Sequence, residues 1–448
     1  MRKRATLAAA VMCTLVSMNA WASSPLPTFD KEAVTERPYN RTGQQEVITD
    51  KTNAGEYQPG NTGTDADPAF YIRQIRLTGE PLPDKTGRLA EILAAYTHRS
   101  VKVSELALLT SQITEYCKSY GYTVPQAIIP QQEIAGGVLE VRVYLAAFDK
   151  VDITANGSEV ADRVLADYIT GLKPGEIMTD KKLESALNNL NDLPGVVARA
   201  VLKPGTKPAT TSVDVEVAHR PMWNNYVFID NGGGYYSGRY RYGVNMELNN
   251  PGHQGDKLTV NGMLSSHDVE NYGVRYEAPV GSRGTRVGVA YSKSSYEMYP
   301  EGILDTLGES EGISIYGMTP IYRDKSNRIT AIYGYDRRDI TDELRWNIPI
   351  SLPKTEKTAN VWHVGISGSQ YNVNQFTQYS MIYWYGDIDT ENQTTIYDGV
   401  YHKLTGDLLN IWYDGRFNYR VSGHAQLANR ALDGSEQFYL GGMDGVRA

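Results

Sequence analysis

Cysteine is nearly absent from this chain. Its 448 residues include two cysteines, Cys13 and Cys117. Cys13 lies in an N-terminal segment that we expect to be cleaved off, so Cys117 would be the only cysteine of the mature protein. No internal disulfide can then form, and stability must come from packing or from a sheet closed on itself.

Long apolar runs and clusters of positive charge are missing as well. Beyond the N-terminus no segment has 18 consecutive apolar residues, which excludes a helical membrane protein. The net charge is -8 and the basic residues are scattered, so nucleic acid is not an expected partner.

Motifs for catalysis and for metal or cofactor binding are weak. "GISGS", residues 365–369, departs from the G-x-S-x-G elbow at its last position. The seven histidines show no H-E-x-x-H spacing, and the glycines at 232–234 fit a turn better than a phosphate cradle. We therefore expect no enzymatic activity, no cofactor and no bound metal.

The N-terminal residues indicate secretion. Arg2, Lys3 and Arg4 precede a short apolar run, and Ala20-Trp21-Ala22 forms an A-x-A cleavage pattern. Residues 1–22 are therefore predicted to be a signal peptide; a retained membrane anchor is the weaker alternative, because the run is short. Residues 23–68 are expected to be an N-terminal segment and linker, since 40–68 contain almost nothing apolar.

Two similar modules follow the linker, at 69–146 and 147–221. In the first, "FYIRQIRL" alternates as a strand, and a helix is predicted from Ser104 as N-cap to Gly121 as stop, with Cys117 facing the core. Two further strands, "QAIIPQQEI" and "VLEVRVYLA", are expected to form a hairpin. The second module repeats this order with the helix "TDKKLESALNNLNDLPG" and the strands "VVARAVLKPG" and "SVDVEVAHR".

From residue 222 to 448 the pattern changes to long alternating strands. "RYRYGVNMEL" places Tyr240, Tyr242 and Val244 on one face and charged or small residues on the other. A soluble β-sandwich would alternate too, but 23 of the 32 tyrosines lie in this part, as in the aromatic girdles of membrane barrels. The pattern favours a transmembrane antiparallel β-barrel with strand runs of roughly 9 to 12 residues.

Eleven strand-like runs occur between Asn224 and Leu427. A bacterial barrel made of one chain closes with an even number of strands, because an open edge cannot be hydrogen-bonded in lipid. We therefore expect the sequence to be truncated in the loop after the eleventh strand.

This order of segments resembles the TpsB transporters of two-partner secretion, the ShlB/FhaC/HecB family. The resemblance covers about residues 70 to 448 and rests on "LNDLPGVVARAVLKPG", "RYEAPVG" and "SEQFYLGGMDGVRA". It implies that the modules are periplasmic POTRA domains and that about 11 of an expected 16 barrel strands are present.

The resemblance also implies a site in the last loop. Gly441, Gly442, Gly445, Val446 and Arg447 match the family's loop motif, which folds into the barrel lumen and holds an acidic residue through its arginine. A buried arginine needs such a carboxylate because its own charge cannot be neutralised. The alternative is an exposed turn with a solvated arginine.

The function implied is transport at the bacterial outer membrane. The modules would capture an unfolded secreted TpsA-type protein, a haemolysin, an adhesin or a contact-dependent toxin, by pairing it with an exposed strand edge. The barrel, monomeric and surrounded by outer-membrane lipid, would export this partner without nucleotide hydrolysis. A barrel-assembly factor and a passive porin are the alternatives; the former usually has more modules, and the latter has no reason to carry any.

Overall fold

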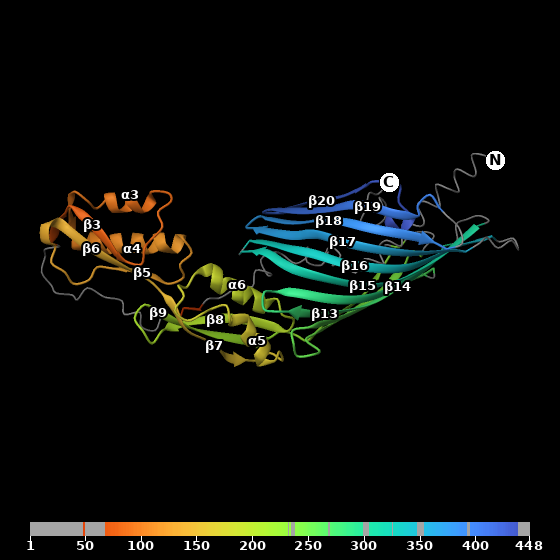
Figure 1. Ribbon diagram of the computed structural model, residues 1–448, viewed down its shortest axis with the longest axis horizontal. Helices are drawn as coiled ribbons and strands as arrows, with labels where there is room; N and C mark the ends of the chain where they lie inside the picture. The colour runs from red at the N-terminus through yellow and green to blue at the C-terminus, as the bar shows by residue number, and fades with distance from the viewer. Residues whose placement is uncertain are drawn as a thin grey trace.

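The computed structural model describes residues 48–49, 68–231, 233, 238–267, 269–298, 304–324, 326–346, 354–391 and 395–437. The predicted signal peptide and nearly all of the predicted linker lie outside these residues. The described chain forms two small strand-helix modules followed by one wide curved sheet, arranged in a row (Figure 1).

The first module places its helices against a three-stranded sheet of order β3-β6-β5, with a separate pair β2-β4. Its elements are β2 (Ala69–Ile72), β3 (Gln74–Gly79), α3 (Arg88–Ala94), β4 (Arg99–Lys102), α4 (Val103–Ser119), β5 (Pro125–Ile128), η3 (Ala135–Gly137) and β6 (Val138–Leu145). The prediction of one strand over "FYIRQIRL" is wrong. The chain divides at Arg73, whose N–H donates to the Gly137 carbonyl, so that β2 pairs with β4 and β3 pairs with β6.

Helix α4 confirms the predicted core face but not the predicted cap. Leu109, Ile113 and Cys117 are buried, as the apolar stripe predicted. The N-cap is Lys102 and not Ser104, which lies in the first turn. The Glu105 carboxylate accepts the Lys102 N–H at 2.9 Å and so satisfies one of the free amides of the helix start.

The second module repeats this arrangement with a sheet of order β1-β8-β9-β7. Its elements are β7 (Ala147–Asn156), α5 (Asp162–Ile169), α6 (Asp180–Asn191), β8 (Val196–Pro204) and β9 (Thr210–His219), with β1 (Ile48–Thr49) added beside β8. In both modules the first strand of this sheet runs parallel to the last strand of the module, which supports the predicted repeat. Leucines on one face of α6, among them Leu183, Leu187 and Leu190, fill the core.

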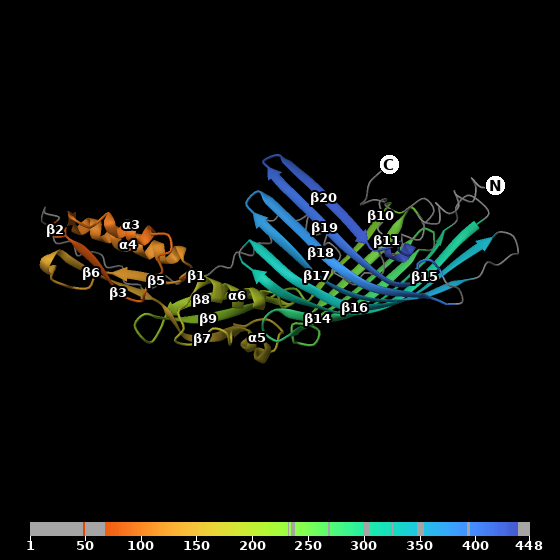
Figure 2. The ribbon, with the colours of Figure 1, turned by 45° about the horizontal axis from the view of Figure 1, so that its top comes forward.

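Eleven antiparallel strands form the large sheet, as predicted, in the simple order β10 to β20. They are β10 (Trp223–Asp230), β11 (Arg241–Asn249), β12 (Lys257–Ser265), β13 (Glu270–Val280), β14 (Thr285–Met298), β15 (Leu304–Arg323), β16 (Asn327–Trp346), β17 (Thr355–Asn372), β18 (Gln375–Thr390), β19 (Gly399–Asp414) and β20 (Phe417–Ala428). Several are longer than expected, since β15 and β16 each have 20 residues. The sheet curves strongly, with one concave face (Figure 2).

The two faces of the sheet differ as the alternation predicts. On β17, Trp362 and Val364 are 59% and 55% exposed, whereas Val361 and His363, which alternate with them, are 0% and 3% exposed. Exposed apolar side chains occur on every strand from β10 to β20, and Tyr242 and Met246 on β11 are examples. A contiguous apolar surface of this kind marks contact with lipid or protein, and the regular period of two fits lipid. None of the helices in the described ranges is both long and apolar enough to cross a membrane.

Candidate functional site

A short segment after β20 turns back onto the concave face of the sheet. This segment, residues 432–437, is called the anchor segment below and contains the 3-10 helix η4 (Gly434–Glu436). It lies inside the curve of the sheet, at the end away from the modules (Figure 2). Asp433 caps the helix by accepting the Ser435 N–H at 3.0 Å, so the turn is encoded locally.

Glu436 holds the anchor segment to two strands at once. Its carboxylate is 1% exposed and is paired with the Arg338 guanidinium of β16 and with Lys403 Nζ of β19, the latter at 2.5 Å. Lys403 Nζ also donates to the Glu436 carbonyl at 3.3 Å. A buried carboxylate is tolerated because two cations and their hydrogen bonds replace its water.

Asp433 makes a second attachment. Lys357 Nζ on β17 lies 2.9 Å from a carboxylate oxygen of Asp433 and 2.9 Å from one of Asp342 on β16. Lys357 is 9% exposed, so the three charges form a buried acid-base-acid group. Removing Lys357 would leave two carboxylates facing each other in the interior without their shared cation, which costs ~3–5 kcal/mol in comparable sites.

Apolar and aromatic side chains complete the bed on which the anchor segment rests. Leu432 packs with Ala359, Val361, Ile388 and Tyr401. A Cβ at Gly386 would come within 2.1 Å of the Tyr401 ring, so this inward position must be glycine for the ring to lie flat on the sheet.

A further buried pair lies beside this bed on the same concave face. His363 Nδ1 of β17 is 3.1 Å from a carboxylate oxygen of Asp336 on β16. The glycines of neighbouring strands again make room, since a Cβ at Gly334 would lie 2.7 Å from the His363 ring.

The predicted loop motif itself is not described. Gly441, Gly442, Gly445, Val446 and Arg447 lie outside the described residues, and the pairing of Arg447 with a carboxylate stays a prediction. In the described part of the loop, the carboxylates belong to the loop and the cations belong to the strands. The predicted motif has the opposite arrangement, with an arginine in the loop and a carboxylate on a strand. The residues that hold the described part were not predicted from the sequence, although charged residues at inward positions of β16, β17 and β19 and the capping pattern of "DGSE" indicate them.

The second module meets the sheet through residues 189–195, called the docking turn. The Asp192 carboxylate accepts from both terminal nitrogens of the Arg323 guanidinium, with the Nη2 contact at 2.6 Å, and from Arg328 at 2.7 Å. Both arginines flank the turn between β15 and β16. Burial raises the pKa of the Asp192 carboxyl, and the pairing with Arg323 opposes this by favouring its charged form.

The docking turn also reaches two other turns of the sheet. Asn189 Nδ2 donates to the Ser282 carbonyl between β13 and β14 at 3.4 Å. A Cβ at Gly255, between β11 and β12, would lie 2.6 Å from Leu193, so the turn packs directly on the Leu193 side chain. Three successive turns at the module end of the sheet therefore contact one short segment that the sequence analysis noted only as a family-like motif.

The described residues contain no group of three or more histidine, cysteine or acidic side chains arranged to hold a metal ion. The arrangement consists of ion pairs that hold one segment on the concave face and one module at the rim. Ion pairs of this kind hold chain segments in place, and they can form and break without any covalent step.

Comparisons with known proteins agree with this architecture. Residues 209–447 match the family model for the haemolysin secretion/activation protein ShlB/FhaC/HecB, and residues 70–144 match the ShlB-type POTRA domain. The chain is 26% identical over 381 residues to the heme/hemopexin transporter protein HuxB of Haemophilus influenzae (strain 86-028NP), covering 81% of this chain and 66% of HuxB. It is 22% identical over 405 residues to the outer membrane transporter CdiB of Dickeya dadantii (strain 3937), covering 85% and 69%.

Two solved structures share the fold. CdiB from Escherichia coli superimposes with a TM-score of 0.67 at 19% identity, covering 93% of this chain and 78% of that one. CdiB from Acinetobacter baumannii gives a TM-score of 0.58 at 17% identity, covering 96% and 81%. The chain spans about two thirds of the length of its curated relatives. Because the family model covers more than half of the chain, the protein belongs to the ShlB/FhaC/HecB family of haemolysin secretion/activation proteins.

Proposed function

We propose that this protein is an outer-membrane transporter that exports a secreted partner protein. The two modules, at 69–146 and 147–221, take up the partner in the periplasm, and the sheet of residues 222–448 forms the wall of the export path. The partner is a large TpsA-type protein that crosses unfolded. No nucleotide hydrolysis takes part, and the protein acts as a monomer surrounded by outer-membrane lipid.

The observation that carries this proposal is the anchor segment. A stretch of polypeptide already lies along the concave face, held by ion pairs to Arg338, Lys357 and Lys403. A packed apolar core could not hold such a segment, whereas a polar lumen can. A face that holds one chain segment through charges can exchange it for another at modest cost, because the ion pairs formed and broken are alike.

The modules supply exposed strand edges for capture. In the first module, β3 ends the three-stranded sheet and pairs on one side with β6. At the other edge strand, β5, Pro125 has no N–H and the Ala127 N–H already donates to Thr114 Oγ1 at 3.1 Å. An edge strand offers amides and carbonyls to an extended peptide, with affinity from the backbone and little sequence demand. Such loose binding suits a partner that must be passed on.

Export by intact cells tests the proposal. The protein and a candidate large secreted partner would be expressed together in cells that lack both, and the partner measured in the medium. We expect secretion with the complete protein and its loss when residues 69–146 are deleted, while surface proteolysis shows that the sheet still inserts. Secretion that continues without the protein would overturn the proposal.

A further inference from the structure

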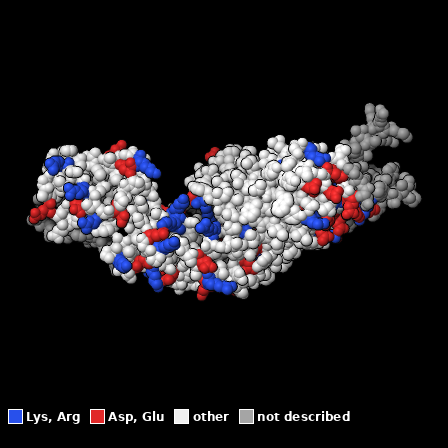
Figure 3. Space-filling view, in the orientation of Figure 1, with Lys and Arg blue, Asp and Glu red and all other residues white. Residues whose placement is uncertain are grey.

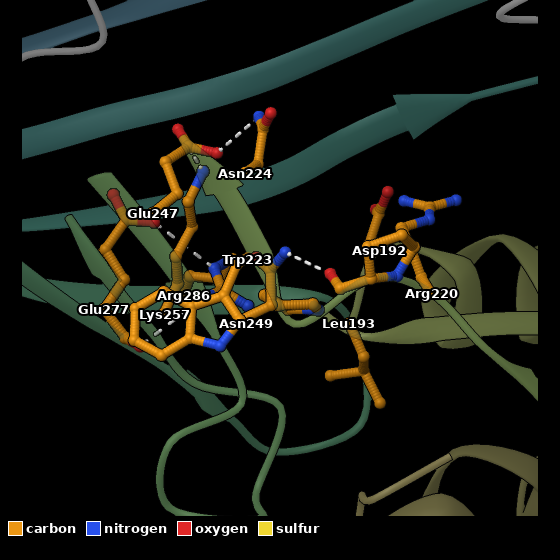
Figure 4. A pocket seen from close by; sticks show the side chains of 12 residues that line it. Asp192, Leu193, Arg220, Trp223, Asn224, Glu247, Asn249, Lys257, Glu277 and Arg286 are labelled. Carbon is orange, nitrogen blue, oxygen red and sulfur yellow. Dashed lines mark hydrogen bonds and ion pairs between the residues drawn. The ribbon is translucent and has the colours of Figure 1, made fainter. Parts of the chain in front are cut away.

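A cavity of about 500 Å³ lies where the second module meets the sheet. This mouth cavity is bounded by the docking turn, by the connection from β9 to β10, and by the module ends of β11 to β14. Its residues include Asp192, Arg220, Trp223, Glu277 and Arg286, and Figure 4 shows their side chains around the opening. Its volume is in the range of sites that hold a ligand, ~300–1,000 Å³.

The cavity opens on the concave face. Glu277 and Arg286 occupy inward positions, since their neighbours Tyr276 and Val287 are exposed on the convex face at 40% and 41%. The same holds for Glu247, next to exposed Met246. A chain passing from the second module to the concave face therefore meets the mouth cavity first.

Three basic side chains, Arg220, Lys257 and Arg286, and three acidic ones, Asp192, Glu247 and Glu277, line the cavity. Positive charge exceeds negative charge once Arg323 and Arg328, which pair with Asp192 from the β15–β16 turn, are counted with them. Lys257 is neutralised by Glu247 at 2.9 Å, and Arg286 lies 3.7 Å from Glu277. Asp192 is shared between Arg323 and Arg328, which leaves one of those two charges unmatched. Figure 3 shows Lys and Arg side chains gathered in a hollow between the modules and the sheet.

Arg220 adds a second unmatched charge. It lines the cavity from the β9–β10 connection and is exposed, and no ion pair is found for it among the residues that the structure describes. Its field reaches Asp192, which already has Arg323 and Arg328 as partners. A guanidinium free to turn offers a planar pair of N–H donors that matches a carboxylate.

We propose that the mouth cavity binds an extended acidic segment of the polypeptide to be exported, with Arg220 pairing a carboxylate and Trp223, 55% exposed, contacting the chain beside it. This inference rests on the proposed function and names the chemistry of its substrate. The site faces the concave side, away from the apolar convex face, so its occupant is a polypeptide and not a lipid headgroup. Attraction between a positive mouth and an acidic segment raises the rate of encounter and weakens with added salt.

The test measures binding of a defined probe to the complete protein in detergent. The probe is a fluorescein-labelled peptide of alternating Glu and Ser, and its matched control has Gln in place of Glu. We expect the Glu peptide to bind on the order of tenfold more tightly than the Gln peptide at low salt, with the difference shrinking as salt is added.

Variants at position 220 separate this site from general charge attraction. Arg220→Glu should lower affinity for the Glu peptide on the order of tenfold, and Arg220→Lys should give an intermediate loss because it keeps the charge without the fork. Arg163→Glu, at an exposed arginine of α5 that does not line the cavity, is the control and should leave binding unchanged. Heat-modifiable gel mobility shows that each variant is folded.

Three of the four results that would overturn the inference are equal binding of the two peptides, equal losses for Arg220→Glu and Arg163→Glu, and displacement of the Glu peptide by inorganic phosphate at matched ionic strength. The last would identify a general anion site. Displacement by vesicles containing phosphatidylglycerol would assign the site to lipid. The proposed function is tested separately: it is contradicted if the unaltered protein exports no partner, independently of the result of the peptide-binding assay.

Discussion

Glu436 is the residue on which attachment of the anchor segment depends most. Its substitution to Gln would leave Arg338 and Lys403 facing each other without their shared carboxylate. We expect the anchor segment to detach locally, and a loss of about 3 kcal/mol corresponds to roughly hundredfold faster opening. Amide hydrogen exchange of residues 432–437, followed by mass spectrometry, measures it.

The control for this substitution is Glu270→Gln, at an exposed position of β13 in the same sheet. It should leave the exchange of residues 432–437 unchanged. If Glu436→Gln also leaves it unchanged, the ion pairs do not hold the segment and packing by Leu432 must suffice.

Cys117 allows a pH test within the first module. Burial raises the pKa of its thiol to about 11, so at pH 8 the folded module contains very little thiolate. We expect iodoacetamide to leave Cys117 unmodified at pH 8 in the native mature protein and to modify it after unfolding in urea. Because the thiol titrates at lower pH once unfolded, raising the pH towards 11 favours the unfolded state through this group. Rapid labelling of the native protein would contradict the buried position of α4.

At the scale of elements, we predict that the docking turn attaches the second module to the sheet through Asp192. Asp192→Arg places a third arginine beside Arg323 and Arg328 and should loosen the second module from the turns of the sheet. Adding Arg323→Asp should restore part of the attachment, because the exchanged charges attract again. Distances between spin labels on α5 and on the β15–β16 turn, measured by electron resonance, should broaden in the single variant and narrow in the double variant.

A matched control on the same module is Arg199→Asp, which removes an ion pair with Glu216 whose arginine is 54% exposed. Exposed pairs contribute ~0–1 kcal/mol, so the distance distribution should stay narrow. A broader distance distribution in Arg199→Asp, or an unchanged one in Asp192→Arg, would contradict the inference that the docking turn attaches the module to the sheet.

At the scale of the whole molecule, we predict that Arg447 joins the loop to the export path. Its position lies outside the described residues, and we predict a carboxylate partner within the barrel lumen. Arg447→Ala should abolish export while the sheet still inserts, and Arg447→Lys should rescue poorly because lysine lacks the planar fork. Secretion of the partner and surface proteolysis of the transporter are the two measurements. Normal export by both variants would reduce the motif to an ordinary loop.

What could be predicted from the sequence was local. The alternation at 361–364 and 240–248, the number of strand runs and the buried stripe of α4 follow from periods of two and 3.6 residues, which are properties of neighbours in the chain. The cap of α4 and the single strand over "FYIRQIRL" were wrong because each depends on a backbone contact, Lys102 with Glu105 and Arg73 with Gly137, that no period encodes.

The tertiary structure decided which charges meet. Arg338 and Glu436 are 98 positions apart, and Asp192 and Arg323 are 131 apart. The amino-acid pattern puts each inward or at a turn, but the register of neighbouring strands, the curvature of the sheet and the return of the chain after β20 bring particular pairs within contact. The alternation of residues along the sequence determined a sheet with one apolar and one polar face. Only the folded chain determined where on the polar face a segment is held and where the mouth cavity is positively charged, because ion pairs form between positions in space and not between positions in sequence.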